Sequence, residues 1–82
     1  MKLKIVTPNG LVFDDEITGI TARTISGDVR ILKNHIDYVT PLANGKIIVT
    51  QSQSQKSGIS KKGLICVMDG DVTVIAWEFM WE

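Results

Sequence analysis

The sequence predicts an all-β fold, a small sandwich of two facing sheets with roughly 8–10 short, mostly antiparallel strands. Three observations support this prediction. Turn signals recur at intervals of about 10–15 residues. The segments between them are rich in Val, Ile and Thr that alternate with polar residues, and no long window has the 3.6-residue period of a helix. Alternating β-branched residues are typical of half-buried strands.

The turn signals divide the chain into its expected strands. Asn-Gly and Asp-Gly pairs between apolar runs are the strongest hairpin marks, because a type I′ turn needs positive φ at both central residues. Turns are expected at residues 8–10, 26–28, 43–45, 55–58 and 69–71. The strands between them are expected at residues 2–7, 11–13, 16–25, 28–32, 38–42, 46–51, 57–61, 63–68 and 71–77.

The first and last expected strands show the alternation most clearly. In the first strand, Leu3 and Ile5 fall on one face, with Lys2 and Lys4 on the other. Two sheets built from strands of this kind, packed with their apolar faces together, would enclose a core about 10 Å thick. In the last strand, one face carries Val72, Val74 and Ala76 and the other carries Thr73, Ile75 and Trp77.

Length and charge exclude several classes of protein. The chain has 82 residues, enough for one domain, and its 9 basic and 9 acidic residues give a net charge of zero. Phosphate binding needs a concentrated basic surface, so nucleic acid is not an expected partner. No stretch approaches the roughly 20 apolar residues of a membrane helix, so membrane association is expected only through partners.

The residues that could carry chemistry do not form a convincing active site. His35 with Asp37 and the single cysteine, Cys66, formally allows nucleophilic catalysis, but Cys66 reads as a small buried hydrophobe in an alternating strand. One His and one Cys cannot complete a zinc site, and the acidic run 14–16 lacks the alternate spacing of a calcium loop. No phosphate-binding glycine motif is present. We therefore expect no catalytic residue, metal or cofactor.

The aromatic tail is the remaining unusual feature. Both tryptophans lie in the last six residues, and Trp77, Phe79 and Trp81 are expected to share one face of a continuing strand. That face needs a cover. Two interpretations stay open: a protein interface, including self-association, or a cap on the domain's own core.

Three segments resemble the epsilon subunits of F-type ATP synthases. Residues 3–14 (LKIVTPNGLVFD) are similar to the family's first hairpin, residues 27–42 (GDVRILKNHIDYVTPL) to its signature G-[ED]-x-G-I-L-P-G-H-A-P-L-V-T-x-L, and residues 63–76 (GLICVMDGDVTVIA) to its closing hairpin. Arg30 replaces a family glycine, Lys33-Asn34 replaces Pro-Gly, and Ile36-Asp37 replaces Ala-Pro. Asn34 can adopt the left-handed conformation that glycine would take.

The resemblance implies a non-catalytic rotor subunit that links the gamma subunit to the membrane c-ring and couples ion movement to ATP synthesis or hydrolysis. The family's acidic turn residue, which faces the c-ring, corresponds to Asp28, and its histidine loop places Arg30, His35 and Asp37 toward gamma. The implied location is the cytoplasmic face of a bacterial plasma membrane, as a peripheral subunit, in preference to a thylakoid or mitochondrial membrane.

The family's two C-terminal helices have no counterpart in these residues, so residues 1–82 are expected to form a single domain that couples without regulating. Two alternatives belong to other classes. One is a free-standing sandwich that binds a ligand or peptide strand, and the other is a minor enzyme that uses His35 and Cys66.

Overall fold

The computed structural model describes all of residues 1–82 and confirms the all-β prediction. It has seven strands and no helix, hence no helix that could cross a bilayer. Neighbouring strands in the sheet order β2-β1-β7-β6-β5-β3-β4 are antiparallel except for the parallel pair β1 and β7. The strands are β1 (Lys2–Thr7), β2 (Gly10–Glu16), β3 (Gly19–Thr24), β4 (Gly27–Leu32), β5 (Tyr38–Gln51), β6 (Ser54–Met68) and β7 (Asp71–Trp81).

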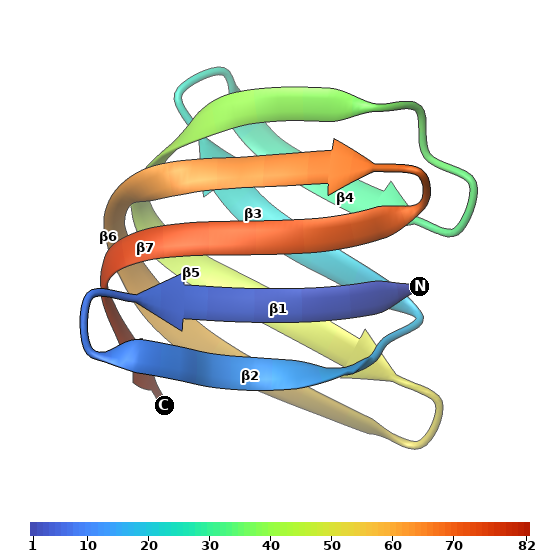
Figure 1. Ribbon diagram of the computed structural model, residues 1–82, viewed down its shortest axis with the longest axis horizontal. Coiled ribbons are helices and arrows are strands. Elements are labelled where there is room, and N and C mark those ends of the chain that lie inside the picture. The colour runs from blue at the N-terminus through green and yellow to red at the C-terminus, as the bar shows by residue number, and fades with distance from the viewer.

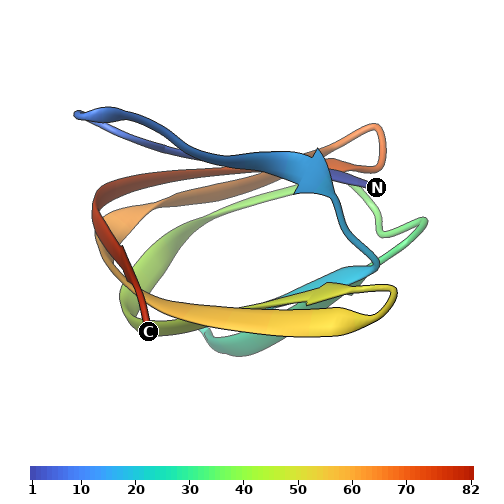
Figure 2. The ribbon, with the colours of Figure 1, turned by 90° about the horizontal axis from the view of Figure 1, so that it is seen from below.

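One continuous sheet makes both layers of the sandwich, because its three longest strands bend and pass from one layer to the other (Figures 1 and 2). The front layer of Figure 1 contains β2 and β1 with residues 71–76 of β7, 63–68 of β6 and 38–42 of β5. The back layer contains β3 and β4 with the remaining halves of the long strands.

The strand count is lower than expected because two expected breaks are bends. The strands expected at 38–42 and 46–51 are one strand, β5, and those expected at 57–61 and 63–68 are one strand, β6. Asn44 Oδ1 accepts a hydrogen bond from the Lys62 backbone N at 3.0 Å, which ties the bends of the two strands together. The true β5–β6 turn lies at residues 52–53, and the strand expected at 16–25 is divided between β2 and β3.

We define the corner as residues 43–46, 61–62 and 77–78. Within each long strand, even-numbered residues face the core on one side of the corner and odd-numbered residues face it on the other side. In β5, Thr40 and Leu42 are buried before the corner, whereas Ile47 and Val49 are buried after it. The same change occurs in β6 and β7. Strand pairing across β5, β6 and β7 keeps the same register on both sides of the corner, so the side chains change faces without a slip in the ladder.

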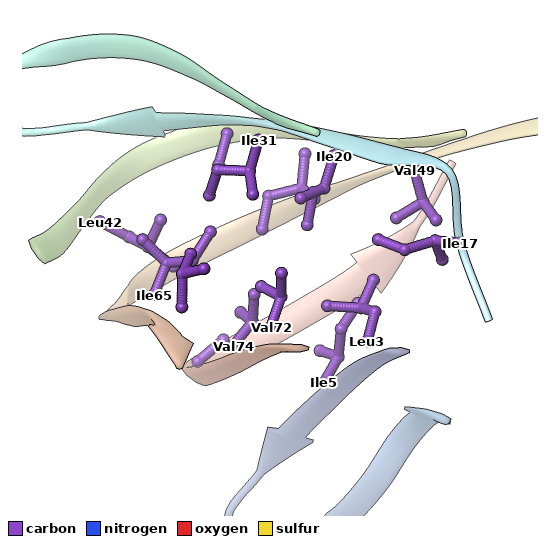
Figure 3. Close-up of a cluster of buried hydrophobic side chains, with 14 residues drawn as sticks. Leu3, Ile5, Ile17, Ile20, Ile31, Leu42, Val49, Ile65, Val72 and Val74 are labelled. Atoms are coloured by element: carbon purple, nitrogen blue, oxygen red, sulfur yellow. The ribbon is translucent and has the colours of Figure 1, made fainter. Parts of the chain in front are cut away.

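The core fills the space between the layers (Figure 3). Its buried aliphatic side chains come from every strand except β2, with Ile17 added from the β2–β3 connection. Burying one such side chain contributes roughly 1.5–3 kcal/mol. The members are Leu3, Ile5, Ile17, Ile20, Ala22, Ile31, Leu42, Ile47, Val49, Ile65, Val67, Val72, Val74 and Ala76.

Candidate partner-binding surface

Asp28 lies at the tip of the β3–β4 hairpin. Arg23 is directly opposite it in the ladder and donates from Nε to Asp28 Oδ1 at 3.0 Å. This hydrogen bond, followed by the charge of the carboxylate, raises the pKa of Arg23. Both side chains are more than half exposed, and Asp28 Oδ2 has no partner within the chain. Thr24 holds the turn by donating from Oγ1 to the Gly27 carbonyl at 2.7 Å, so the carboxylate is presented from an ordered hairpin.

The histidine loop connects β4 to β5. Asn34 has a φ of 69°, the left-handed conformation expected for it, and the His35 backbone N donates to the Leu32 carbonyl at 3.2 Å. His35 Nδ1 lies 2.7 Å from the Ile36 carbonyl oxygen. Because a carbonyl oxygen only accepts, Nδ1 carries the ring proton in this arrangement. The ring also tilts against Tyr38, with centroids 5.9 Å apart, and the one hydrogen bond of the imidazole within the chain uses Nδ1 and not Nε2.

Asp37 and Arg30 make contacts within the domain. Asp37 Oδ1 accepts a hydrogen bond from the Asp69 backbone N at 3.0 Å, which ties the histidine loop to the β6–β7 turn. Arg30 Nη1 donates to Thr21 Oγ1 at 3.2 Å across the β3–β4 pair. Both residues remain exposed. Each therefore has a structural contact and a solvent-facing surface.

The sites suggested by Asp28 and by His35 are separate. They lie at opposite ends of β4, as Figure 1 shows. Six residues of extended strand span roughly 17–20 Å. The two ends of the back layer can therefore meet different partners, whereas one small ligand cannot touch both.

The aromatic tail does not present a single face. Phe79 and Trp81 turn inward and pack edge to face at 4.8 Å, and Trp81 meets Phe13 of β2 at 5.8 Å. Lys56 Nζ lies 4.3 Å from the Trp81 ring centroid, a cation–π contact. Trp77 instead faces solvent with 68% of its surface exposed. The expectation that all three share a face is wrong for Trp77, because the corner inverts β7 between Trp77 and Phe79.

Cys66 also differs from expectation. It is half-buried and lies on the outer face of the front layer, because the inward positions of β6 are taken by Ile65 and Val67.

The acidic run at residues 14–16 has partners within the chain: Lys2 Nζ lies 3.8 Å from Asp14, and the N-terminal ammonium lies 3.0 Å from Glu16. No three His, Cys, Asp or Glu side chains come together as metal ligands.

One surface was missed by sequence reasoning. The outer face of the front layer carries an apolar row, one residue from each of its five strands, paired in register. The alternation along β7 indicates an outward-facing apolar position, since Ile75 and Trp77 lie opposite the buried face of β7. Which residues of the neighbouring strands lie beside them depends on the strand order. The apolar row is Pro41 (β5), Leu64 (β6), Ile75 (β7), Val6 (β1) and Leu11 (β2).

Comparison with known proteins identifies the type of domain. The family model described as the ATP synthase delta/epsilon chain β-sandwich domain matches residues 1–82. An ATP synthase epsilon chain of Alkaliphilus metalliredigens is 39% identical over 74 residues, with 90% of this chain and 54% of that protein covered. One from Alkalihalophilus pseudofirmus is 30% identical over 76 residues, with 93% and 57% covered. The chain thus spans little more than half the length of these relatives.

Solved structures show the same fold. A chain in the mitochondrial ATP synthase of Euglena gracilis, a structure of OSCP, F1 and c-ring, superposes with a TM-score of 0.90 at 24% identity, covering 96% of this chain and 51% of that chain. A chain in the central stalk and c-ring of the Tetrahymena thermophila mitochondrial ATP synthase gives a TM-score of 0.85 at 16% identity, covering 98% and 65%.

Proposed function

This chain belongs to the delta/epsilon family of ATP synthase chains, and we propose that it acts as the epsilon subunit in the central stalk of a rotary F-type ATP synthase. In this role it links the gamma subunit to the c-ring, so that ion translocation is coupled to ATP synthesis or hydrolysis. The observation that carries the proposal is the family match, which extends over residues 1–82.

Asp28 is the proposed contact to the c-ring. Its hairpin tip is exposed, and Oδ2 is free to accept a hydrogen bond from a basic or amide group. A charge-assisted hydrogen bond of this kind is stronger than a neutral one. Arg23 orients the carboxylate, because its Nε donates a hydrogen bond to Asp28 Oδ1 at 3.0 Å.

The histidine loop is the proposed contact toward gamma. His35 offers its free Nε2 as an acceptor, and Arg30 offers guanidinium donors beyond the one used by Thr21. Asp37 acts by shaping the loop, because its Oδ1 already holds the Asp69 backbone N. Of the tail residues, the exposed Trp77 is the one available to a partner, whereas Phe79 and Trp81 pack against the domain.

We assign the chain no catalytic residue and no cofactor, because in this role ATP chemistry takes place on other chains of the complex. As an ATP synthase subunit it is associated with a membrane-bound complex. Its proposed position is peripheral, on the cytoplasmic face of a bacterial plasma membrane, where partner subunits hold it.

The proposal is tested by reconstitution. The chain is mixed with the gamma-containing catalytic core and the membrane sector of the same organism, and ATP-driven ion pumping is measured in vesicles. We expect binding to the core at micromolar affinity or better and a gain in pumping per ATP hydrolysed. The Asp28→Ala variant serves as the matched control, because it should keep the core contact and lose part of the pumping. Absence of binding to the core would refute the proposal.

The alternative, a free-standing binding module, draws on the two open sheet edges, β2 and β4. Unpaired edge groups can accept a peptide as an added strand. Peptide binding that persists while the chain ignores the core would favour this alternative.

A further inference from the structure

We propose that residues 77–81 of β7 form a strand-addition site, at which the free edge of this strand accepts an extended segment of another polypeptide as a further antiparallel strand of the back layer. The segment that is complementary to this edge alternates basic and apolar residues. The site is separate from the Asp28 and histidine-loop contacts of the proposed function, and the inference does not depend on them.

The site exists because β1 is shorter than β7. β1 pairs with residues 72–75 of β7 and ends at Thr7, whereas β7 continues past the corner into the back layer (Figure 1). In the back layer β6 pairs with one side of β7, and no strand pairs with the other side. The sheet therefore has a third open edge in addition to β2 and β4.

The open edge carries backbone groups that β6 does not use. The Glu82 backbone N donates to the Ser57 carbonyl at 2.9 Å, so these two residues form a bonded pair. Bonded and non-bonded pairs alternate along an antiparallel ladder, which makes Phe79 and Trp81 non-bonded partners of β6. Their N–H and C=O groups therefore point to the open side. An added strand would satisfy them, as peptides do in edge addition.

Open space lies along this edge. A groove of about 560 Å³ borders the six successive residues 77–82, with Ile59 of β6 and with Thr7 and Asn9 beside the β1–β2 turn. A strand edge covered by other side chains would leave no such groove. The backbone of residues 79 and 81 is thus within reach of a partner strand.

The residues of this edge favour pairing. Proteins protect open edges with charged residues, above all lysine, and with proline. The open edge strand β2 has three consecutive acidic residues, 14–16, whereas residues 77–81 contain no lysine or proline and three aromatic residues. Aromatic side chains pair favourably with aromatic or β-branched ones on a neighbouring strand. Of these two edges, β7 is therefore the less protected.

Charge specifies the partner. Glu78 and Glu82 alternate with Met80 on the outer face of β7. Their lysine partners, Lys61 at 3.8 Å and Lys46 at 3.3 Å, belong to β6 and β5, so neither carboxylate has an ion pair on the open side. Opposite charges on neighbouring strands stabilise the strand pair. An added strand is complementary when it places basic residues beside the two glutamates and apolar residues between them.

The same charges argue against a second copy as the occupant. β7 has no lysine or arginine. Two copies paired through this edge would bring their glutamates onto one face with no basic residue of either β7 between them. Like charges opposite one another destabilise a strand pair. The occupant is therefore a segment of a different chain.

The test uses the capped synthetic peptide KVKVKVK, with its affinity measured by isothermal titration calorimetry at about 50 mM salt to limit screening. Two backbone-methylated forms separate edge pairing from side-chain attraction. N-methylation of the valine amides, which face β7 in the paired register, removes ladder bonds and should weaken binding at least about tenfold. N-methylation of the lysine amides, which face away, should change the affinity less than about threefold.

Two charge reversals locate the site on the protein. Glu78→Lys should weaken binding of the peptide about three- to tenfold, because an attractive cross-strand pair becomes repulsive. Asp15→Lys makes the same change on β2, the acidic edge, and should alter the affinity less than about twofold. Both side chains are exposed, and circular dichroism verifies the fold of each variant.

Several results would overturn the inference while leaving the proposed function untouched. One is no binding of the peptide to the wild-type chain at about 1 mM. Another is methylation of the valine amides that weakens binding no more than methylation of the lysine amides. A greater loss for Asp15→Lys than for Glu78→Lys would move the site to β2. A wild-type dimer in sedimentation velocity that the peptide dissociates would make a second copy the occupant.

Discussion

Among the glycines of the chain, Gly63 is the one whose substitution with Ala the fold predicts to be most severe. Gly63 lies opposite Ala76 where β6 bends at the corner. A Cβ at this position would lie 2.9 Å from Ala76 Cα and would collide more severely with the Ile75 carbonyl oxygen. Both atoms belong to the β7 backbone, so rotation of a side chain cannot relieve the collision.

The size of the effect follows from that geometry. Carbon atoms in contact prefer about 3.5–4.0 Å, so β7 would have to move by at least about 0.6 Å. Overpacking costs about 1–3 kcal/mol, and each ladder hydrogen bond lost near the corner adds about 1 kcal/mol. We expect a total loss of about 3–5 kcal/mol, a large part of the roughly 4–12 kcal/mol that stabilises a domain of this size.

Urea unfolding followed by far-ultraviolet circular dichroism measures the loss. With a slope of about 1 kcal/mol per molar urea, the midpoint should fall by about 3–5 M, enough to leave part of the chain unfolded in buffer. Gly70→Ala is the matched control, because Gly70 has a φ of 82° and nothing near its absent Cβ. That variant pays only the left-handed backbone strain of about 1–2 kcal/mol. Equal losses in the two variants would show that the collision at the corner is not the cause.

The remaining predictions concern the tail, the hairpin tip and the outer face. Trp81→Ala removes two aromatic contacts and a cation–π contact and should lower stability by about 2–4 kcal/mol in the same urea assay; an unchanged midpoint would contradict the packing. Asp28→Asn should leave the midpoint unchanged, because its pair with Arg23 is exposed, yet weaken association with c-ring vesicles; equal retention on the vesicles would argue against the assigned contact. Alkylation of Cys66 by N-ethylmaleimide should proceed in the folded chain without urea, because Cys66 is half-buried on the outer face of the front layer; mass spectrometry that finds reaction only after unfolding would contradict this placement.

Local patterns in the sequence predict a strand correctly where its position depends only on its own residues and on the adjoining turn. Residues 2–7 and the Asp69–Asp71 turn are found where alternation and the Asp-Gly pair place them. The Ala43–Gly45 segment reads as a hairpin turn by the same rules. In the structure it is a bend, because Asn44 bonds to β6 and β5 continues into the other layer.

The candidate sites divide in the same way. The position of Asp28 at a hairpin tip follows from its Gly-Asp turn, and the left-handed Asn34 follows from the residue type. The separation of Trp77 from Phe79 could not be predicted, because the corner arises only when three strands bend together. The apolar row was equally hidden, since its five residues are brought into line by the sheet order and not by spacing along the chain.

The parallel pairing of β1 with β7 has a consequence for synthesis on the ribosome. The Lys2 backbone N reaches the Asp71 side chain, 69 positions along the chain, and β1 has no other neighbour than β2 until β7 arrives. A two-stranded hairpin alone is marginal in water. At about 5–20 residues per second, the nascent β1–β2 hairpin therefore waits several seconds with one edge open. A pause in translation before β7 emerges would prolong the interval in which that edge can pair with the wrong chain.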